Sequence, residues 1–171
     1  MRLFATASMI VLMFGVAEPA IAGGIQVEGA WARASIGTER PSVAYMKIRN
    51  NGQGADRLIG AKTPVAKHAM VHESLIRDGV RKMRQAENIE IAPGGTAVLE
   101  PGGLHLMLSI LQKRLMEGDA FPLTLTFEHA GEVRIYVTVA GMGAKQMPQH
   151  HHDHHDDPAH DDHQDHHGHD E

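Results

Sequence analysis

Four side chains in the middle of the sequence could together bind a soft metal ion: His72, Met83, His105 and Met107. Ten residues separate the first two, twenty-one separate the second and third, and one separates the last two. Thioether sulfur selects monovalent copper and imidazole suits copper in general, so these donors suit Cu(I). The chain has no cysteine, which excludes the His₂Cys arrangement of an electron-transfer blue-copper site.

The pair His105 and Met107 is expected to face away from the protein core. Residues two apart on a strand share a face, and both lie in a predicted strand over residues 105–111. The apolar residues that alternate with them are expected to fill the core: Leu104, Leu106, Leu108 and Ile110. The site would therefore lie near the surface, where a metal ion can pass to a partner protein.

His72 belongs to an earlier predicted strand, residues 65–76, and shares its face with His68 and Met70. These two neighbours could supplement the site or simply pack against it. A lone histidine is usually a hydrogen-bonded structural residue, and a lone methionine usually fills gaps in a core. The metal hypothesis therefore depends on the whole set.

The dipeptide Asp78-Gly79 favours a tight hairpin turn, because both residues tolerate positive φ. Such a turn would bring the predicted strand 80–85, which contains Met83, back beside the strand of His72. Neither face of residues 80–85 is plainly apolar. The pattern therefore does not indicate which way Met83 points.

Short predicted strands separated by turn signals run through residues 23–143, the body of the chain. Period-two alternation is clearest over residues 121–127 and 133–139. The other expected strands are residues 26–33, 42–49, 57–62, 65–76, 80–85, 96–100 and 105–111. Only residues 112–118 look helical. This spacing predicts an all-β fold, an antiparallel β-sandwich or barrel.

The first 22 residues are typical of a secretory signal peptide. Arg2 supplies the positive charge, residues 3–16 form an apolar run, and residues 20–22 (Ala-Ile-Ala) resemble a cleavage site. The apolar run is shorter than the roughly 20 residues that span a bilayer. We expect cleavage after Ala22 and a soluble protein in a bacterial periplasm, with no membrane span.

Residues 144–171 form a tail that is rich in histidine and aspartate. Residues 148–171 hold eight of the 21 acidic residues and none of the 16 Lys and Arg. We expect this segment to be disordered without metal, because it has almost nothing to bury. The rest of the chain lacks the dense basic patch of a nucleic-acid binder, so no nucleic-acid partner is expected.

The tail histidines are candidate metal ligands as a set. They are His150, His151, His152, His154, His155, His160, His163, His166, His167 and His169. Imidazole with carboxylate suits Cu(II), Zn(II) or Ni(II), and the usual affinity order favours Cu(II). Binding should weaken below about pH 6 to 6.5, where imidazole protonates. A solvated acidic tail or a purification tag is the alternative, but the interspersed aspartates do not resemble a simple tag.

The spacing H-x10-M-x21-H-x-M resembles the signature of the PCuAC-type periplasmic copper chaperones. The likeness covers almost the whole body of the chain. The matching segments are AWARAS (30–35), AYMKIRNNG (44–52), DRLIGA (56–61), DGVRKMR (78–84), IAPGGTAVLEPGGLHLML (91–108) and GDAFPLTLTFEHAGEV (118–133). One departure is local: many relatives have Met soon after the first ligand histidine, where this chain has Glu73 and Ser74.

The resemblance implies a cupredoxin-like Greek-key β-sandwich with an exposed Cu(I) site made by the four residues. It also implies delivery of copper to the CuA centre of cytochrome c oxidase, alongside a Sco-type thiol protein. A second possibility is a copper or zinc reservoir or resistance protein without a delivery target. We expect no enzyme activity, since nucleophile-elbow, HExxH and phosphate-loop motifs are absent from the sequence.

Overall fold

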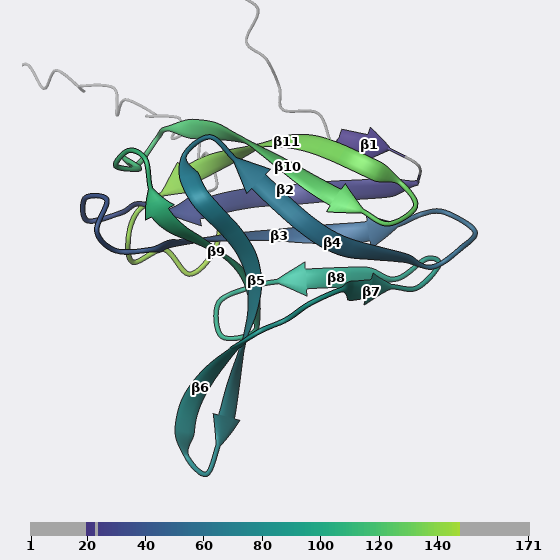
Figure 1. The fold of residues 1–171 in the computed structure, drawn as a ribbon, viewed down its shortest axis with the longest axis horizontal. Coiled ribbons are helices and arrows are strands. Elements are labelled where there is room, and N and C mark those ends of the chain that lie inside the picture. The colour runs from purple at the N-terminus through teal and green to yellow at the C-terminus, as the bar shows by residue number, and fades with distance from the viewer. Residues whose placement is uncertain (1–19, 23, 148–171) are drawn as a thin grey trace, which may run out of the picture.

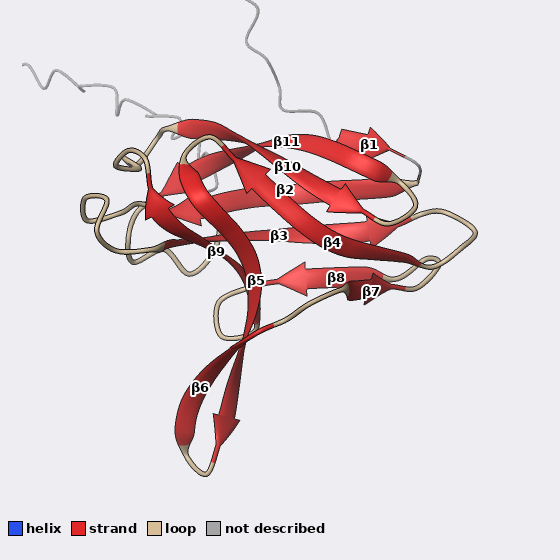
Figure 2. Cartoon of the chain, in the orientation of Figure 1, coloured by secondary structure: helices blue, strands red, loops and turns tan. Residues whose placement is uncertain are grey.

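All regular elements in the described part of the chain are β-strands. The structure, a computed structural model, describes residues 20–22 and 24–147 of the 171-residue chain. Figure 2 shows strands joined by loops, with no helix among these residues. The strands are β1 (Ala20–Ala22), β2 (Ile25–Arg33), β3 (Ser42–Asn50), β4 (Asp56–Thr63), β5 (Ala66–Arg77), β6 (Val80–Gln85), β7 (Ile89–Ile91), β8 (Thr96–Leu99), β9 (Leu104–Leu111), β10 (Ala120–Phe127) and β11 (Gly131–Ala140).

The strands form one 11-stranded sheet that closes on itself. Its order is β6-β5-β9-β8-β3-β2-β11-β10-β4-β7, and further pairings of β5 with β4 and of β9 with β3 complete a ring. Most neighbours are antiparallel, whereas β11 pairs with β2 and β8 pairs with β9 in parallel. The predicted all-β fold is confirmed as a closed sandwich, and two parallel pairs interrupt its antiparallel pattern.

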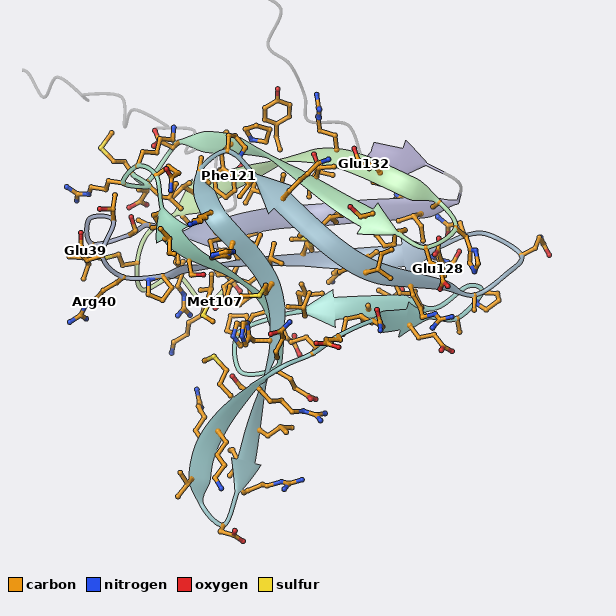
Figure 3. All side chains as sticks on the ribbon, in the orientation of Figure 1. Glu39, Arg40, Met107, Phe121, Glu128 and Glu132 are labelled. Atoms are coloured by element: carbon orange, nitrogen blue, oxygen red, sulfur yellow. The ribbon has the colours of Figure 1, made fainter. Side chains whose placement is uncertain are left out.

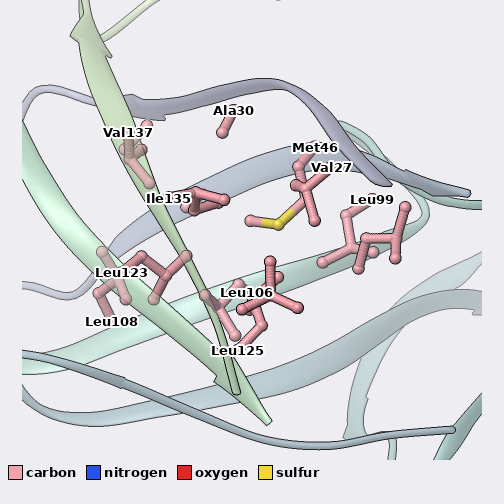
Figure 4. Packing of buried hydrophobic residues seen from close by; sticks show 14 of the residues in the cluster. Val27, Ala30, Met46, Leu99, Leu106, Leu108, Leu123, Leu125, Ile135 and Val137 are labelled. Atoms are coloured by element: carbon pink, nitrogen blue, oxygen red, sulfur yellow. The ribbon is translucent and has the colours of Figure 1, made fainter. Parts of the chain in front are cut away.

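The hydrophobic core fills the inside of this ring. Figure 4 shows Leu106 and Leu108 of β9 with Leu123 and Leu125 of β10, and all four belong to the buried cluster. Full burial of one such side chain stabilises a fold by about 1.5–3 kcal/mol relative to leaving it in water. With no cysteine in the sequence, the core and the sheet ladders hold the site in place without disulfides.

Strand β9 departs once from strict alternation. Ile110 has a φ of 54°, which is uncommon for a β-branched residue, and its side chain is 55% exposed. The next residue, Leu111, is buried instead. The expectation that Ile110 fills the core is therefore wrong, because the backbone turns at this residue and Leu111 takes the inward position.

Residues 112–118 form a loop, so the expected short helix is wrong. Leu115 in this loop is fully buried. Its N–H donates to Ser35 Oγ at 3.0 Å, and its carbonyl accepts from Ser35 N–H at 2.9 Å. These contacts across the fold satisfy backbone groups that a helix would pair internally.

The hairpin of β5 and β6 projects from the body as an arm (Figure 1). Its turn residues, Asp78 and Gly79, have φ values of 54° and 74°, as the Asp-Gly signal predicts. Across the hairpin, Arg84 Nε and Nη2 donate to Glu73 Oε2 at 2.9 and 2.7 Å. The far part of the arm has only its own turn and cross-strand contacts to hold it, because all six residues of β6 are exposed.

Most of the predicted signal peptide and of the tail lies outside the described residues. Ala20–Ala22, at the predicted cleavage site, pair with β2 as the short strand β1. At the other end, Arg33 Nε donates to the Ala144 carbonyl at 3.0 Å, so the folded body extends at least one residue past Gly143. Within the described residues there is no helix of the length and apolarity needed to cross a membrane.

Candidate metal centre

Strand register brings the predicted ligands of the body to one face of the sheet. On β5 and β9, His72 stands directly opposite His105, and Met70 directly opposite Met107. Residues directly opposite in an antiparallel pair project to the same side, with Cβ atoms about 4.5–5.5 Å apart. Residues two apart on one strand also share a side. The two strands therefore present a row of two histidines beside a row of two methionines.

Met83 joins this face from the neighbouring strand. On β6 it stands opposite Ser74 of β5, and Ser74 shares a face with His72 because they are two residues apart. Met83 is thus a diagonal neighbour of His72, and such neighbours have α-carbons about 7–8 Å apart. The sequence did not indicate to which face Met83 points, and the register of the hairpin decides it.

The two imidazole rings lie close together with their ring planes nearly parallel. Their centroids are 6.1 Å apart and the ring planes differ by 24°. His72 Nδ1 lies 3.2 Å from the Met70 carbonyl oxygen, and His105 Nδ1 lies 3.0 Å from the Gly103 carbonyl oxygen. Each Nδ1–H donates to a carbonyl, which leaves each Nε2 with a free lone pair, as metal-binding histidines require.

His105 Nε2 is buried and has no hydrogen-bond partner. A buried polar atom without a hydrogen-bond partner lowers the stability of a fold by about 1–3 kcal/mol. In native structures such an atom usually has a specific role, for example binding an ion. His105 itself is 4% exposed and His72 is 9% exposed. The imidazoles are thus more deeply enclosed than a surface site implies.

The thioethers lie on the solvent side of the two histidines. Met107, labelled in Figure 3, and Met70 are partly buried. Met83 is 54% exposed. The expected exposed site therefore has buried nitrogen donors, half-buried sulfur donors on the body and one open sulfur donor on the arm.

An aromatic pair lies at the junction of β2 and β3. β2 and β3 pair Trp31 with Tyr45, and the neighbouring residue Val43 of β3 pairs with Met107 of β9. Tyr45 packs on Trp31 with ring centroids 4.6 Å apart, and both are buried. Burial raises the pKa of the Tyr45 phenol, while the Arg33 guanidinium 5.7 Å from its ring acts in the opposite direction. These rings form a small cluster outside the main core, against which Val43 packs.

The carboxylate nearest in sequence to His72 points away from this face. Glu73 lies one residue from His72, so it projects to the other face of β5, where Arg84 pairs with it. Across residues 20–22 and 24–147, no group of three or more His, Cys, Asp or Glu side chains could hold a metal ion. Within the described residues, the side chains that share the face of the two histidines and could act as further donors to a soft metal are the methionines. His68 stands opposite Ser109 and is exposed, two residue pairs along the β5–β9 ladder from the histidine pair on the same face. The ten tail histidines lie outside the described residues.

Comparison with known proteins finds a family and a relative that are both described as lipoproteins. The family model described as "Putative lipoprotein LpqE-like" matches residues 25–139. A relative from Leifsonia xyli subsp. xyli, also named as a lipoprotein, is 31% identical over 119 residues, which cover 69% of this chain and 70% of the relative.

Two solved structures extend the comparison. The copper-bound PCuAC domain of PmoF2 matches with a TM-score of 0.62 and 30% identity, over 72% of this chain and 98% of that domain. The Cu(I) form of DR1885 from Deinococcus radiodurans matches with a TM-score of 0.51 and 27% identity, over 72% of this chain and 80% of that one. Because the family model covers residues 25–139 and the PCuAC domain of PmoF2 matches over 98% of its length, the chain belongs to the LpqE-like family and has the fold of the PCuAC domains.

Proposed function

We propose that this chain carries Cu(I) in the periplasm, held by His72, Met83, His105 and Met107. The observation that carries the proposal is the buried, unpartnered Nε2 of His105, directly opposite a second histidine and beside a methionine. The similar PmoF2 domain is described as copper-bound, and DR1885 as a Cu(I) form. Soft thioethers beside imidazoles favour monovalent copper over zinc or magnesium.

The same donors suit release as well as capture. Thioethers and imidazoles are neutral, so they hold Cu(I) less firmly than thiolates do. Because Met83 is on the projecting arm and is exposed, an incoming ligand of a partner can reach the copper ion from that side. One bond to the carrier then breaks as one bond to the acceptor forms, and copper keeps its oxidation state.

The acceptor in this proposal is the CuA centre of cytochrome c oxidase, with a Sco-type thiol protein acting alongside. Support comes from the family likeness and from the exported character of the sequence, which begins like a signal peptide and has relatives named as lipoproteins. In the same proposal, the histidine-rich tail captures Cu(II) and the body carries Cu(I).

X-ray absorption after anaerobic Cu(I) titration tests the carrier function. A chain ending at Met147, titrated with one equivalent of Cu(I), should show both sulfur and nitrogen scatterers at the copper edge. Alanine at all four ligand positions should abolish tight binding, with retention of the fold checked by circular dichroism. Normal uptake of Cu(I) by that quadruple variant would refute the site.

The ten tail histidines favour one competing function, a reservoir that sequesters copper or zinc. A transfer assay separates the two functions. The carrier should lose Cu(I) to an apo CuA domain within minutes of mixing, with recovery of the CuA absorption after oxidation. A reservoir would keep its metal in the presence of the same domain.

A further inference from the structure

We propose that Met70 is a further copper ligand, which together with Met107 retains Cu(I) when Met83 is exchanged for a ligand of the acceptor. This inference rests on the proposed function and concerns the same site. The motif that identifies the four predicted ligands does not include Met70. Its assignment comes from strand register, exposure and the arrangement of sulfur donors around the two histidines.

Met70 occupies a position equivalent to that of Met107. Each is two residues from a histidine on its own strand, and the two stand directly opposite each other on β5 and β9. Such opposed residues have α-carbons about 4.5–5.5 Å apart, and their side chains share a face. A copper ion above the histidines that can be reached by Met107 can therefore also be reached by Met70.

Met83 approaches from the other end of the histidine row. Along β5 the face carries Met70, then His72, then Ser74, which is the partner of Met83 on β6. Two residues of strand advance by about 6.6–6.8 Å, so the two body methionines and Met83 lie on opposite sides of the histidine pair. The donors therefore divide into a sulfur pair on the closed sheet and one sulfur on the arm.

Exposure divides the donors in the same way. Met70 and Met107 are partly buried, and their strands are joined over seven registered pairs, from Ala66↔Leu111 to Glu73↔Leu104. Met83 is 54% exposed on a strand whose residues are all exposed. Met70 also borders a cleft lined by Ala61, Gln85 and Ala86, so part of its flexible side chain faces open space.

The exchange step follows from this division. A lone pair of the acceptor forms a bond to Cu(I) as the bond from Met83 sulfur breaks. Copper remains monovalent, and neither an electron nor a proton moves. With Met70 bound, the ion keeps two nitrogen and two sulfur donors during the exchange. Without it, only one sulfur donor would remain.

The test uses the full mature chain with one equivalent of Cu(I) under anaerobic conditions. In Met83→Leu, copper-edge absorption should still report two sulfur scatterers, and in Met70→Leu with Met83→Leu it should report one. A competing Cu(I) chelator should show at least a tenfold lower affinity for the double variant than for Met83→Leu alone. One sulfur in Met83→Leu, or equal affinities of these two variants, would overturn the role of Met70.

Two control variants test whether the effect is specific to Met70. His68→Ala removes the other candidate on the same face of β5, and Met116→Leu changes an exposed methionine in the loop before β10; both should bind Cu(I) as the unchanged chain does. Methyl NMR of the unchanged chain avoids any effect of substitution on folding. On adding Cu(I), the methyl signals of Met70, Met83 and Met107 should shift, whereas that of the core residue Met46 should not.

The outcomes also separate this inference from the proposed function. If the unchanged chain binds Cu(I) without sulfur, both fail. If it binds through sulfur but the Met70 methyl signal stays in place, the carrier function stands and the role of Met70 as a ligand is refuted.

Discussion

In the described structure, one of the two ring nitrogens of His105 has a hydrogen-bond partner and the other has none. Its Nδ1 donates to the Gly103 carbonyl, and its buried Nε2 faces the site without a partner. The Gly103 carbonyl also accepts from Ser74 N–H at 3.2 Å, so it does not depend on the histidine. The protein therefore contains a buried polar atom that destabilises the fold unless a ligand pairs with it.

Replacing His105 with leucine should separate binding from stability. His105→Leu removes the buried unpaired nitrogen and leaves the Gly103 carbonyl with a donor. The free energy of unfolding of the apo protein should therefore rise by about 1 kcal/mol, while Cu(I) affinity falls at least tenfold. Urea unfolding and competition with a Cu(I) chelator measure the two effects. A loss of stability together with normal binding would show that the ring is structural.

At this scale the sequence predicted which residues meet, but not how they are enclosed. Residue types and spacing predicted His72, His105 and Met107 as ligands, and alternation placed His105 and Met107 on one face. That His72 shares this face follows from the register of β5 with β9. The direction of Met83 depends on its pairing with Ser74, which no property of residues 80–85 indicates. The burial of His105 Nε2 without a hydrogen-bond partner depends on tertiary packing, which becomes visible only in the folded chain.

At the scale of elements, the arm formed by β5 and β6 differs from the rest of the sheet. Its turn was predictable because Asp78 and Gly79 both adopt positive φ, and alternation predicted most other strands. The failures have local causes: the backbone turn at Ile110, the contacts of Leu115 with Ser35, and the strands β1 and β7, which are too short to show a period.

Gly79→Val should loosen the arm without affecting the core. Gly79 has a φ of 74° and open space around it, so the cost is conformational, about 1–2 kcal/mol for an L side chain in this region. Amide exchange in β6 should accelerate and Cu(I) affinity should fall toward that of Met83→Leu. Amide exchange in β10 serves as the internal control and should not change. Equal acceleration in both strands would mean that the arm and core unfold together.

At the scale of the whole molecule, ring closure positions the site, and it was not predictable from local patterns. Closure depends on the pairing of β4 with β5 and on the tie between the start of β4 and the turn after β10. Asp56 makes this tie: its carboxylate accepts from the N–H groups of Arg57, His129 and Ala130 at 2.7–3.0 Å. Burial acts to raise the pKa of Asp56, but these three donors outweigh it, and the pKa lies below its ordinary value.

Acid should therefore remove part of the stability of the fold. Asp56→Asn should lower the free energy of unfolding by about 2 kcal/mol at neutral pH, since hydrogen bonds to a charged group contribute about that much. The contribution of the carboxylate is fully present above the unfolded-state pKa, about 3.9, and is lost as pH falls through the lower folded-state pKa. Urea unfolding of both proteins across acidic pH should show the difference shrinking. A constant difference would exclude an ionic role.

The tail should change metal capacity without changing the site in the body. A chain ending at Met147 keeps the contact between Arg33 and Ala144 and lacks the ten tail histidines. Its Cu(I) affinity should equal that of the full chain, while its Cu(II) stoichiometry should be lower, and the Cu(II) difference should vanish below about pH 6 as imidazoles protonate. Equal Cu(II) stoichiometry in the two proteins would refute capture by the tail.

None of the buried hydrophobic residues in the described structure lies between Glu73 and Gln85, although this stretch supplies Met83. Selection on the surface of the arm is consequently almost independent of selection on folding. Substitutions at exposed positions of the arm should therefore carry little penalty in expression or melting temperature. In the proposed function copper leaves by way of Met83, so exchanging the arm between relatives directly tests whether it selects the recipient.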